Sequence, residues 1–546
     1  MKDSLNQLLA ILTPGSYAYN ILAKCLTRSE LLVSVSGLMP NLVSEVPDLK
    51  VLQKWLNGSF SRHMLAKAGI FVQPEALPNA VDGRFQVLCA DRNENRLIHP
   101  KNALGMYYGK AELYASSGQV CVYNDCMVYA ENTHVSCCND SRASLLHNCH
   151  AQLGDFSRCI AADNNEVLLT NYASVTTERI KEGQTNTIHA KGFSTVNLNT
   201  QGNRVVANGM PMIFDWHAHA IDFVKSGLLY QPFGKAKQVT NPAVISVFDK
   251  EACAYLREYA SRRDELRHQP HISLAERMPS DILVEYRKAD SDERRIEVIL
   301  RHFDQLAAQG LRGRELEAEF STDFLSSHQV YTNQSIPPIE TKGDYYVLGD
   351  TMYTQTSAQG HGHFADCAVG CVEAGTIESL GHSLAVAMKS GKAYGEHLLV
   401  GLEQGEIVCF GRSKAVALGE SSAKASEVAY VEAAQHATVT ADGHTISHLK
   451  GEAHGEFSGE ASFVAEERSS YVCKERAKGC KVIPYVNPYL HENAKKEESP
   501  HWGVPTGVAE RPDSVTKIEE SAVISMLDTY RRQQTIPEMG RYVWKR

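Results

Sequence analysis

The sequence has no long apolar run. No segment reaches the roughly 18 to 20 uncharged apolar residues that a membrane-spanning helix needs. The first residues contain Asp3 and only a short apolar stretch before Pro14, which is not typical of a secretory signal. We therefore expect a soluble, cytoplasmic protein without a membrane partner, while a non-classical secretion route would leave no such trace.

The sequence also has fewer basic than acidic residues. Lys and Arg total 55 against 64 Asp and Glu, a formal net charge of -9 over 546 residues. Because nucleic acids are bound by concentrated basic surfaces, this balance gives no reason to expect a nucleic-acid partner. With 43% hydrophobic and 22% charged residues, the composition is that of a globular protein long enough to bury a sizeable core.

The 14 cysteines do not form the facing Cys-x-x-Cys pairs that structural zinc sites usually use. Cys367 and Cys371 are four residues apart, and Cys473 and Cys480 are seven apart. Disulfide frameworks belong mainly to short secreted chains. We therefore expect reduced thiols that pack as small apolar side chains, with a metal site as the weaker alternative.

The strongest feature that is present is an eight-residue repeat, which holds its phase over nine octads between 396 and 467. The columns that begin at Leu399 and Gly401 are almost entirely small or apolar, and charged residues lie between them. This alternation is typical of a strand with one buried face and one solvent-exposed face. A third column is Gly or polar, as a recurrent corner would require. Its members are Gly395, Glu403, Gly411, Gly419, Glu427, Gln435, Gly443, Gly451 and Gly459.

Residues 119 to 174 show the same construction with Asn or Asp at the corners, since both tolerate left-handed backbone angles. The corner residues are Asn124, Asn132, Asp140, Asn148 and Asn164. One predicted inner column is Cys121, Tyr129, Cys137, Leu145, Leu153, Ala161 and Leu169. The other is Met127, Val135, Ala143, Ala151, Cys159, Val167 and Val175.

Short extended segments that alternate with corners favour a parallel β-solenoid, in which equivalent residues of successive coils stack into ladders. We predict a mainly β fold with α-helical parts, containing two octad-repeat parallel β-solenoid segments at 101–210 and 341–473. A coil would contain either two octads or three, and whether the segments stack into one is left open. The alternative is a set of antiparallel hairpins, but hairpin turns vary more in length than these corners do.

The remaining regions, 1–100, 211–340 and 474–546, are expected to be largely helical and to join or cap the solenoids, whose open ends need cover. One amphipathic helix is predicted from a cap at Ser291 to Gly310. A second is expected over about 250–267 and a third from Ser514.

Two histidine pairs are candidate metal ligands. The first lies in the segment from Met212 to Asp222, where His217 and His219 would project from one face of a strand, close to Asp215. This spacing resembles the first metal motif of amidohydrolases over about five residues. Those enzymes use a barrel of roughly 200 or more residues, and only about 130 residues separate the motif from the second repeat. A polar patch or packing pair is the alternative.

The second pair is His361 and His363, with the same spacing. Asp366 and Cys367 are close by in sequence, and Asp350 would add a ligand if the two segments met. The glycines at 360 and 362 are not followed by the Lys-Ser or Lys-Thr of a phosphate loop, so they favour an ordinary turn and no nucleotide site.

Our first functional interpretation is a non-enzymatic β-solenoid scaffold or binding protein, because the octads are long and regular and no complete catalytic set is visible. The partner would be a protein or a polysaccharide on a solenoid face, and homo-oligomer formation is left open. The alternatives are a metal-dependent hydrolase that uses residues 215–219, and a polysaccharide-binding or polysaccharide-processing protein that uses acids such as Glu452, Glu456 and Glu460. No cofactor is predicted, and zinc at a histidine pair is the alternative.

Overall fold

The computed structural model describes residues 2–482 apart from 47, 74–76, 82, 179–184, 235–240, 242, 271, 334, 339, 467 and 475. The chain forms two compact units, residues 1–248 and 249–546, which are described separately. No helix in the described part of the chain is both long and apolar enough to cross a membrane. The third predicted helix, at Ser514, lies outside the described residues.

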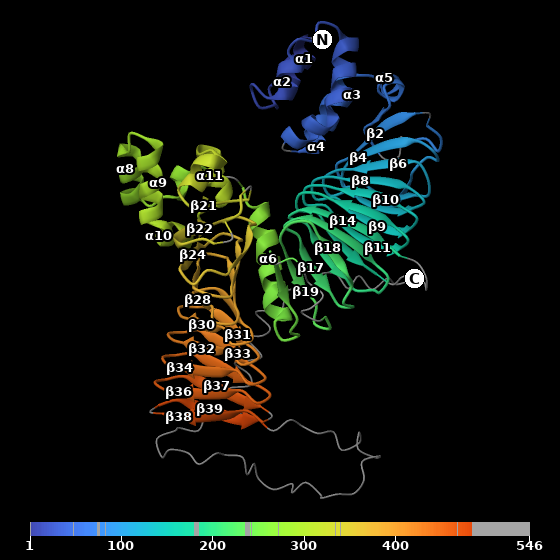
Figure 1. Cartoon of the computed structure of the whole chain (residues 1–546). Helices are drawn as coiled ribbons and strands as arrows, with labels where there is room; N and C mark the ends of the chain where they lie inside the picture. Colours follow the sequence, from blue (N-terminus) through green and yellow to red (C-terminus); the bar gives the residue numbers. More distant parts are fainter. Residues whose placement is uncertain are drawn as a thin grey trace, which may run out of the picture. The chain divides into compact units, whose positions relative to one another are not determined.

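The first unit contains two parallel sheets of ten strands each (Figure 1). In order across the sheet, sheet A contains β1 (Ile70–Phe71), β2 (Arg84–Cys89), β4 (Leu104–Gly109), β6 (Gln119–Val122), β8 (His134–Cys137), β10 (His150–Leu153), β12 (Glu166–Leu169), β14 (Thr187–Gly192), β16 (Arg204–Gly209) and β18 (Ile221–Phe223). Sheet B contains β3 (Leu97–Ile98), β5 (Glu112–Ala115), β7 (Met127–Glu131), β9 (Arg142–His147), β11 (Arg158–Asp163), β13 (Ser174–Thr177), β15 (Thr195–Leu198), β17 (Met212–Asp215), β19 (Gly227–Tyr230) and β20 (Val244–Val247).

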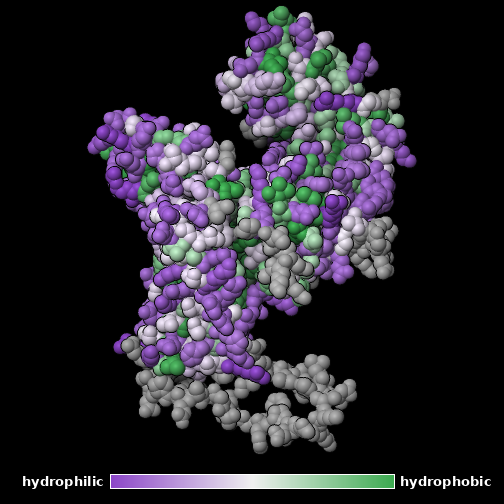
Figure 2. Space-filling view, viewed as in Figure 1, coloured by the Kyte–Doolittle hydropathy of each residue, from purple (hydrophilic) through white to green (hydrophobic). Residues whose placement is uncertain are grey.

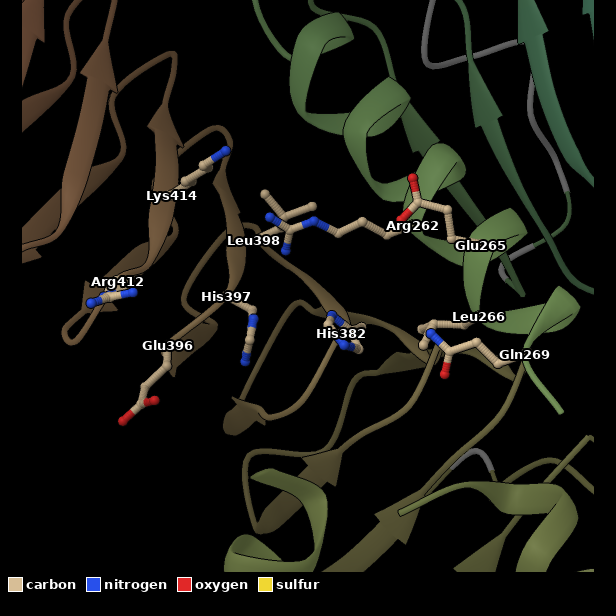
Figure 3. Close-up of a pocket in the computed structure, with 10 residues that line it drawn as sticks. All are labelled: Arg262, Glu265, Leu266, Gln269, His382, Glu396, His397, Leu398, Arg412 and Lys414. Atoms are coloured by element: carbon tan, nitrogen blue, oxygen red, sulfur yellow. The ribbon is translucent and has the colours of Figure 1, made fainter. Parts of the chain in front are cut away.

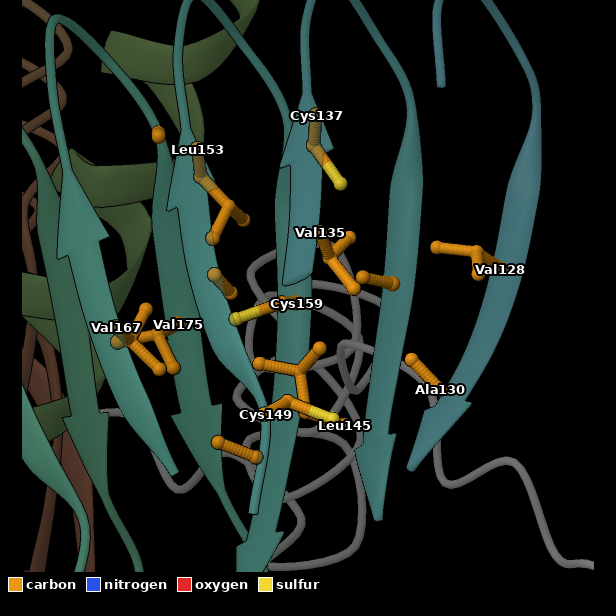
Figure 4. Packing of buried hydrophobic residues seen from close by; sticks show 14 of the residues in the cluster. Val128, Ala130, Val135, Cys137, Leu145, Cys149, Leu153, Cys159, Val167 and Val175 are labelled. Atoms are coloured by element: carbon orange, nitrogen blue, oxygen red, sulfur yellow. The ribbon is translucent and has the colours of Figure 1, made fainter. Parts of the chain in front are cut away.

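From β2 to β19 the chain alternates between the two sheets, so each coil of the solenoid contributes one strand to each. His150 pairs with Glu166 in sheet A and Arg158 with Ser174 in sheet B, so one coil corresponds to two octads. The inner side chains form one continuous core between the sheets, in which Cys137, Cys149 and Cys159 pack among Val and Leu side chains (Figure 4). Burial raises the pKa of the Cys137 and Cys159 thiols well above the ordinary range, so these cysteines act as apolar core residues.

The inner columns predicted for this unit are wrong in its early coils. Cys121, Met127 and Tyr129 are only partly buried, and their neighbours Val120, Val122 and Val128 face the core instead. The register shifts between Ala130 and Glu131, where the strand is irregular. A one-residue shift exchanges the two faces of a strand, which explains the error. From Val135 onward the predicted columns are buried.

Five helices precede the first sheet: α1 (Lys2–Leu9), α2 (Tyr17–Leu22), α3 (Arg28–Glu45), α4 (Leu49–Ser59) and α5 (Arg62–Lys67). Thr27 caps α3 with a reciprocal capping box that involves Glu30. The apolar faces of these helices pack together with Leu88, Met106 and Tyr108, on the outer side of β2 and β4. The helices therefore cover the early coils of sheet A.

The second unit contains two more parallel sheets, of ten and nine strands. Sheet C contains β21 (Val330–Tyr331), β22 (Gly343–Val347), β24 (Gly360–Phe364), β26 (Thr376–Ser379), β28 (Lys392–Gly395), β30 (Glu406–Cys409), β32 (Ser422–Ala425), β34 (Thr438–Ala441), β36 (His454–Phe457) and β38 (Ser470–Cys473). Sheet D contains β23 (Met352–Gln355), β25 (Val369–Val372), β27 (Leu384–Ala387), β29 (Leu398–Gly401), β31 (Lys414–Ala417), β33 (Tyr430–Ala433), β35 (Ile446–Leu449), β37 (Ser462–Glu466) and β39 (Lys478–Val482).

The corners of this solenoid follow the predicted column. The eight residues of that column from Glu403 to Gly459 have a φ between 53° and 69°, including Glu403, Glu427 and Gln435, whereas Gly395 is the last residue of β28. The side chains of Glu427 and Gln435 accept hydrogen bonds from the Gly411 and Gly419 amides of the preceding coil, at 3.0 and 2.8 Å. These bonds help to hold non-glycine residues in a left-handed conformation that otherwise costs free energy.

Sheet D differs from the predicted alternation of buried and solvent-exposed faces, because its outer face is largely buried as well. Both faces of β25, β27 and β29 are buried along their full length. The helix α6 (Cys253–His268), close to the predicted range 250–267, lies over this face. Its Glu258 carboxylate binds the Lys414 ammonium at 2.9 Å, and its Arg267 guanidinium binds the Asp350 carboxylate at 2.6 Å.

A group of short helices follows: α7 (Leu274–Arg277), α8 (Ser280–Lys288), α9 (Asp292–Arg301), α10 (Phe303–Ala308), α11 (Gly313–Glu319) and α12 (Thr322–Ser327). Ser291 caps α9 as predicted, but the helix breaks at His302 and continues as α10. Their apolar side chains pack with Leu348 and Ala365 beside the first coils of the second solenoid.

The prediction of a mainly β fold with parallel solenoids and helical regions is confirmed. All strand pairs in the described residues are parallel, so the antiparallel alternative is wrong. The offset in the regular part of each solenoid corresponds to two octads per coil rather than three. The strands extend from Ile70 to Val247 and from Val330 to Val482, beyond the ranges over which the sequence phase can be followed.

Candidate metal centre

His217 and His219 do not lie in a strand, and this part of the sequence prediction is wrong. Strand β17 ends at Asp215, and the two histidines follow in a turn where Ala218 has a φ of 56°. The Asp215 carboxylate is fully buried and accepts hydrogen bonds from both histidine amides and from His219 Nδ1, at 3.0, 2.6 and 2.7 Å. Gln231 donates to the same carboxylate at 2.7 Å. Asp215 therefore holds the turn closed.

The rings of this pair have other neighbours. His217 Nε2 lies 2.9 Å from the Asn199 carbonyl oxygen, and the two ring centroids are 6.1 Å apart. Across the described residues, two groups of three His, Cys, Asp or Glu side chains have their ligand atoms close together, and neither group includes His217 or His219. Metal binding by this pair remains a prediction, and its local geometry favours a structural role.

His361 and His363 lie on β24 and share the outer face of sheet C. The strand has the burial pattern of alternating inward and outward side chains, and Gly360, Gly362 and Phe364 are the buried positions. Asp344 lies on the neighbouring strand β22 and is paired with His361. Glu378 lies on the other neighbouring strand, β26, and is paired with His363. Pairing of adjacent coils thus brings residues 344, 361, 363 and 378 onto one surface.

Three of these side chains form a compact ligand set. Asp344 Oδ1 is 3.2 Å from His361 Nδ1 and 3.8 Å from His363 Nε2, and all three atoms lie within 4.8 Å of one another. Around a tetrahedral ion with bonds of about 2.0 to 2.1 Å, neighbouring ligand atoms are about 3.3 Å apart. The observed separations require only a small closure of the three side chains around an ion.

The second nitrogen of each ring already has a partner. His363 Nδ1 lies 2.9 Å from Glu378 Oε2, and His361 Nε2 forms a short contact with the Tyr394 hydroxyl. If Glu378 and Tyr394 accept N–H bonds, the free lone pairs of His363 Nε2 and His361 Nδ1 face Asp344. A ligand histidine whose other nitrogen is held by a carboxylate is the usual arrangement at metal sites.

A pocket of about 590 Å³ opens beside this group. Its other wall is the end of α9 and the start of α10, from Leu300 to Gln305. Tyr346 stacks on His363 with centroids 4.9 Å apart, and Phe303 packs on Tyr346 at 4.7 Å. Aromatic packing therefore helps to fix the orientation of the His363 ring.

Asp304 on α10 adds a second carboxylate to the pocket. The other compact group of possible ligand atoms consists of a carboxylate oxygen of Asp304, a carboxylate oxygen of Glu378 and a ring nitrogen of His363. Burial, followed by repulsion from the Glu378 carboxylate, raises the pKa of Asp304 above its ordinary value, while the two histidines oppose this change. Carboxylates on either side of His363 would stabilise a cation bound between them.

Asp350 does not join this site. Its carboxylate binds Arg263 and Arg267 of α6, and these two guanidinium groups hold the pKa of Asp350 below its ordinary value against the opposing effect of burial. Asp366 accepts a hydrogen bond from the Gly313 amide at 3.2 Å. Cys367 is buried, and its carbonyl oxygen accepts a hydrogen bond from Tyr259. The expectation that Asp350 would complete the shell is wrong.

Sequence reasoning found the two histidines but missed Asp344, Glu378 and Tyr394. Asp344 of β22 pairs with His361, and this spacing is longer than two octads. His361 in turn pairs with Thr376, and that spacing is shorter than two octads. A strict count in eights therefore does not place these residues together. The signal that could have found them is the alternation of polar residues in 343–347, 360–364 and 376–379.

The acidic residues that suggested carbohydrate chemistry have basic partners. Glu452 pairs with His436 and Arg468, Glu456 with Lys474, and Glu460 with His444 and Arg476. Each partner lies on an adjacent coil, so these acids belong to charged ladders on a largely hydrophilic surface (Figure 2). No family model, curated protein or solved structure matches the chain.

Proposed function

We propose that this protein is a β-solenoid binding protein whose second unit holds a divalent transition-metal ion on Asp344, His361 and His363. The metal would bind a donor atom of the protein's partner at a coordination position that these three residues leave open. The observation that carries the proposal is the combination of three converging ligand atoms with hydrogen-bond partners on both remaining ring nitrogens.

The donor set favours zinc as the first candidate. Two imidazole nitrogens and one carboxylate oxygen suit Zn²⁺ and also non-haem Fe²⁺, whereas the absence of thiolate from this group disfavours the softest ions. Three protein ligands leave a position open for water or a partner group. The adjoining pocket provides room for that group on the side of α9 and α10.

The solenoid would supply the rigid frame. Residues on stacked coils are fixed relative to one another by backbone pairing on both sides, so side chains from three coils can be held as one site. The partner remains a proposal: a protein that offers a histidine or acidic side chain suits the metal best. A polysaccharide partner and self-association are the alternatives.

Metal-dependent hydrolysis is the second candidate, favoured by the open position and the pocket of about 590 Å³ beside it. A metal-bound water could act as the nucleophile in such a site. This candidate differs from the motif at 215–219 because it places the chemistry on His361 and His363. Turnover of ester or phosphoester substrates that depends on added zinc would favour it over simple binding.

The experiment is a competition titration of zinc with a coloured chelator, using the full chain. The His361→Ala/His363→Ala double variant is compared with His217→Ala/His219→Ala, which removes an equally spaced pair from the other unit. We expect about one tight zinc site in the wild type, loss of about 100-fold or more in affinity in the first variant, and little change in the second.

Two outcomes would contradict the proposal. The first is wild-type zinc affinity in the His361→Ala/His363→Ala variant when its circular dichroism shows that it is folded. The second is loss of zinc only in the His217→Ala/His219→Ala variant, which would transfer the site to the first unit.

A further inference from the structure

A second pocket in the same unit lies on the other side of the solenoid, between α6 and the turns that lead into sheet D. Its volume is about 410 Å³. The helix contributes Arg262, Glu265, Leu266 and Gln269, and the solenoid contributes His382, Glu396, His397, Leu398, Arg412 and Lys414. Figure 3 shows Arg262 reaching from α6 toward the strands, where Lys414, His397 and His382 lie.

The polar groups of this pocket include a buried ring nitrogen of His382. His382 Nδ1 is buried and has no hydrogen-bond partner among the described residues. The partly buried His397 ring lies beside it, with the two ring centroids 5.6 Å apart, and the Arg412 side chain is exposed at the pocket. Because buried polar groups are nearly always hydrogen-bonded, an unpaired ring nitrogen beside a cavity points to a ligand.

The residues that line the pocket include three cationic side chains, those of Arg262, Arg412 and Lys414, and two carboxylates. Arg262 and Lys414 share one carboxylate, that of Glu258, at 2.5 and 2.9 Å. The pocket's other acids, Glu265 and Glu396, are exposed at its rim. Arg412 is the third cation, and it is exposed like these two acids.

Both histidines in the pocket have lowered pKa values, mainly because they are buried, and nearby cationic groups add to the effect. Burial, and then the neighbouring His382 and Arg262, lower the pKa of His397 to about 4. Burial, and then Arg262 and Arg312, lower the pKa of His382. Both rings are therefore neutral near pH 7, and each offers one N–H donor. Neutral donors among guanidinium groups form a surface suited to an anion.

We propose that this pocket binds the phosphate group of a small phosphorylated molecule, held by Arg262, Arg412 and the ring N–H groups of His382 and His397. Guanidinium groups match the oxygens of a phosphate group and can bind two of them at once. A bare phosphate would fill only part of about 410 Å³, so the remaining space would hold the organic part of the ligand. Gln269 and the rim acids would bind its hydroxyl groups. The site is independent of the metal centre.

The test is isothermal titration calorimetry of the full chain with glycerol 3-phosphate, inorganic phosphate and glycerol. We expect saturable binding of glycerol 3-phosphate, weaker binding of inorganic phosphate and none of glycerol. Arg412→Gln and His397→Gln should each weaken glycerol 3-phosphate binding about tenfold or more, because each removes a direct donor to the phosphate. Arg476→Gln is the matched control, since Arg476 is an exposed arginine of the same solenoid whose nearest carboxylate is 3.9 Å away.

Absence of saturable binding up to about 10 mM would overturn the proposal, since a site of useful affinity would be filled at that concentration. Equal weakening in Arg476→Gln would overturn it as well, because it would show only a general effect of charge. Equal affinity for inorganic phosphate and glycerol 3-phosphate would overturn the claim that the pocket holds the organic part. Because Arg412 is exposed, Arg412→Gln is expected to fold normally.

Discussion

His363 Nδ1 lies 2.9 Å from Glu378 Oε2, and the two residues are paired directly across adjacent strands β24 and β26. The carboxylate thus fixes the ring so that Nε2 points toward Asp344, 3.8 Å away. This relationship makes Glu378 a positioning residue for the proposed metal and leads to the first prediction.

Glu378→Gln should lower zinc affinity by about 10- to 100-fold, because loss of the charged partner weakens the orientation and basicity of His363. The matched control is Glu456→Gln, since Glu456 occupies the same position on β36 of the same sheet and pairs with Lys474. The measurement is the same chelator competition, with zinc affinity read for both variants. Equal affinity in Glu378→Gln and the wild type would show that the carboxylate does not orient a ligand.

Val439→Asp should unfold or strongly destabilise the second solenoid. Val439 is 1% exposed and belongs to the continuous core of that unit, so the substitution buries an unpaired carboxylate. We expect a loss of several kcal/mol, measured by chemical denaturation. Thr440→Asp is the control, because Thr440 is the next residue and faces solvent, and it should change stability by about 0.5 kcal/mol or less. Similar effects of both substitutions would refute the assignment of inner and outer faces.

Asp366→Asn should make the second unit more stable near neutral pH. Burial, and then the neighbouring Asp350 carboxylate, raise the pKa of Asp366 from 3.8 to about 6. The folded protein therefore binds this proton more tightly than the unfolded chain, so the wild type loses stability as pH rises from about 4 to about 6. Asparagine cannot ionise, can still accept the Gly313 hydrogen bond and tolerates the φ of 59° at this position.

The expected gain is at most roughly 3 kcal/mol near pH 7, since the pKa of Asp366 is raised from 3.8 to about 6 and one pKa unit corresponds to about 1.4 kcal/mol. Urea denaturation across pH 4 to 7 would measure it, and the gain should vanish at the acid end of the range. Asp442→Asn, at an exposed corner of the same solenoid, should change stability little. A variant that is less stable than the wild type at neutral pH would show that the charged form of Asp366 is stabilised in the fold.

Much of the solenoid could be predicted because its constraints are local. Each corner needs a left-handed residue, which selects Gly or Asn, and each strand buries alternate residues, which selects small apolar side chains. Asn132, Asn148 and Asn164 therefore lie at positive φ as expected. At Asp140 the expectation fails by one residue, because Asn139 has the positive φ instead. The second corner of each coil recurs at Asn139, Asp155 and Asn171, so coil length is constant here and the shift arises because the two halves of a coil are unequal.

The rest depends on contacts between distant parts of the chain. The outer face of sheet D is buried because α6 covers it, and no octad carries the information that Glu258 will meet Lys414. Likewise, Asp344 and Glu378 join His361 and His363 only because coils of irregular length bring strands β22, β24 and β26 into register. The histidine pair was visible in the sequence, whereas the remaining ligands depend on tertiary pairing.

The most direct test of the metal centre is a crystal of the zinc-loaded protein with anomalous data collected on both sides of the zinc absorption edge. We predict one strong anomalous peak about 2.0 to 2.2 Å from Asp344 Oδ1, His361 Nδ1 and His363 Nε2. A peak elsewhere, or no peak within bonding distance of these three atoms, would contradict the account.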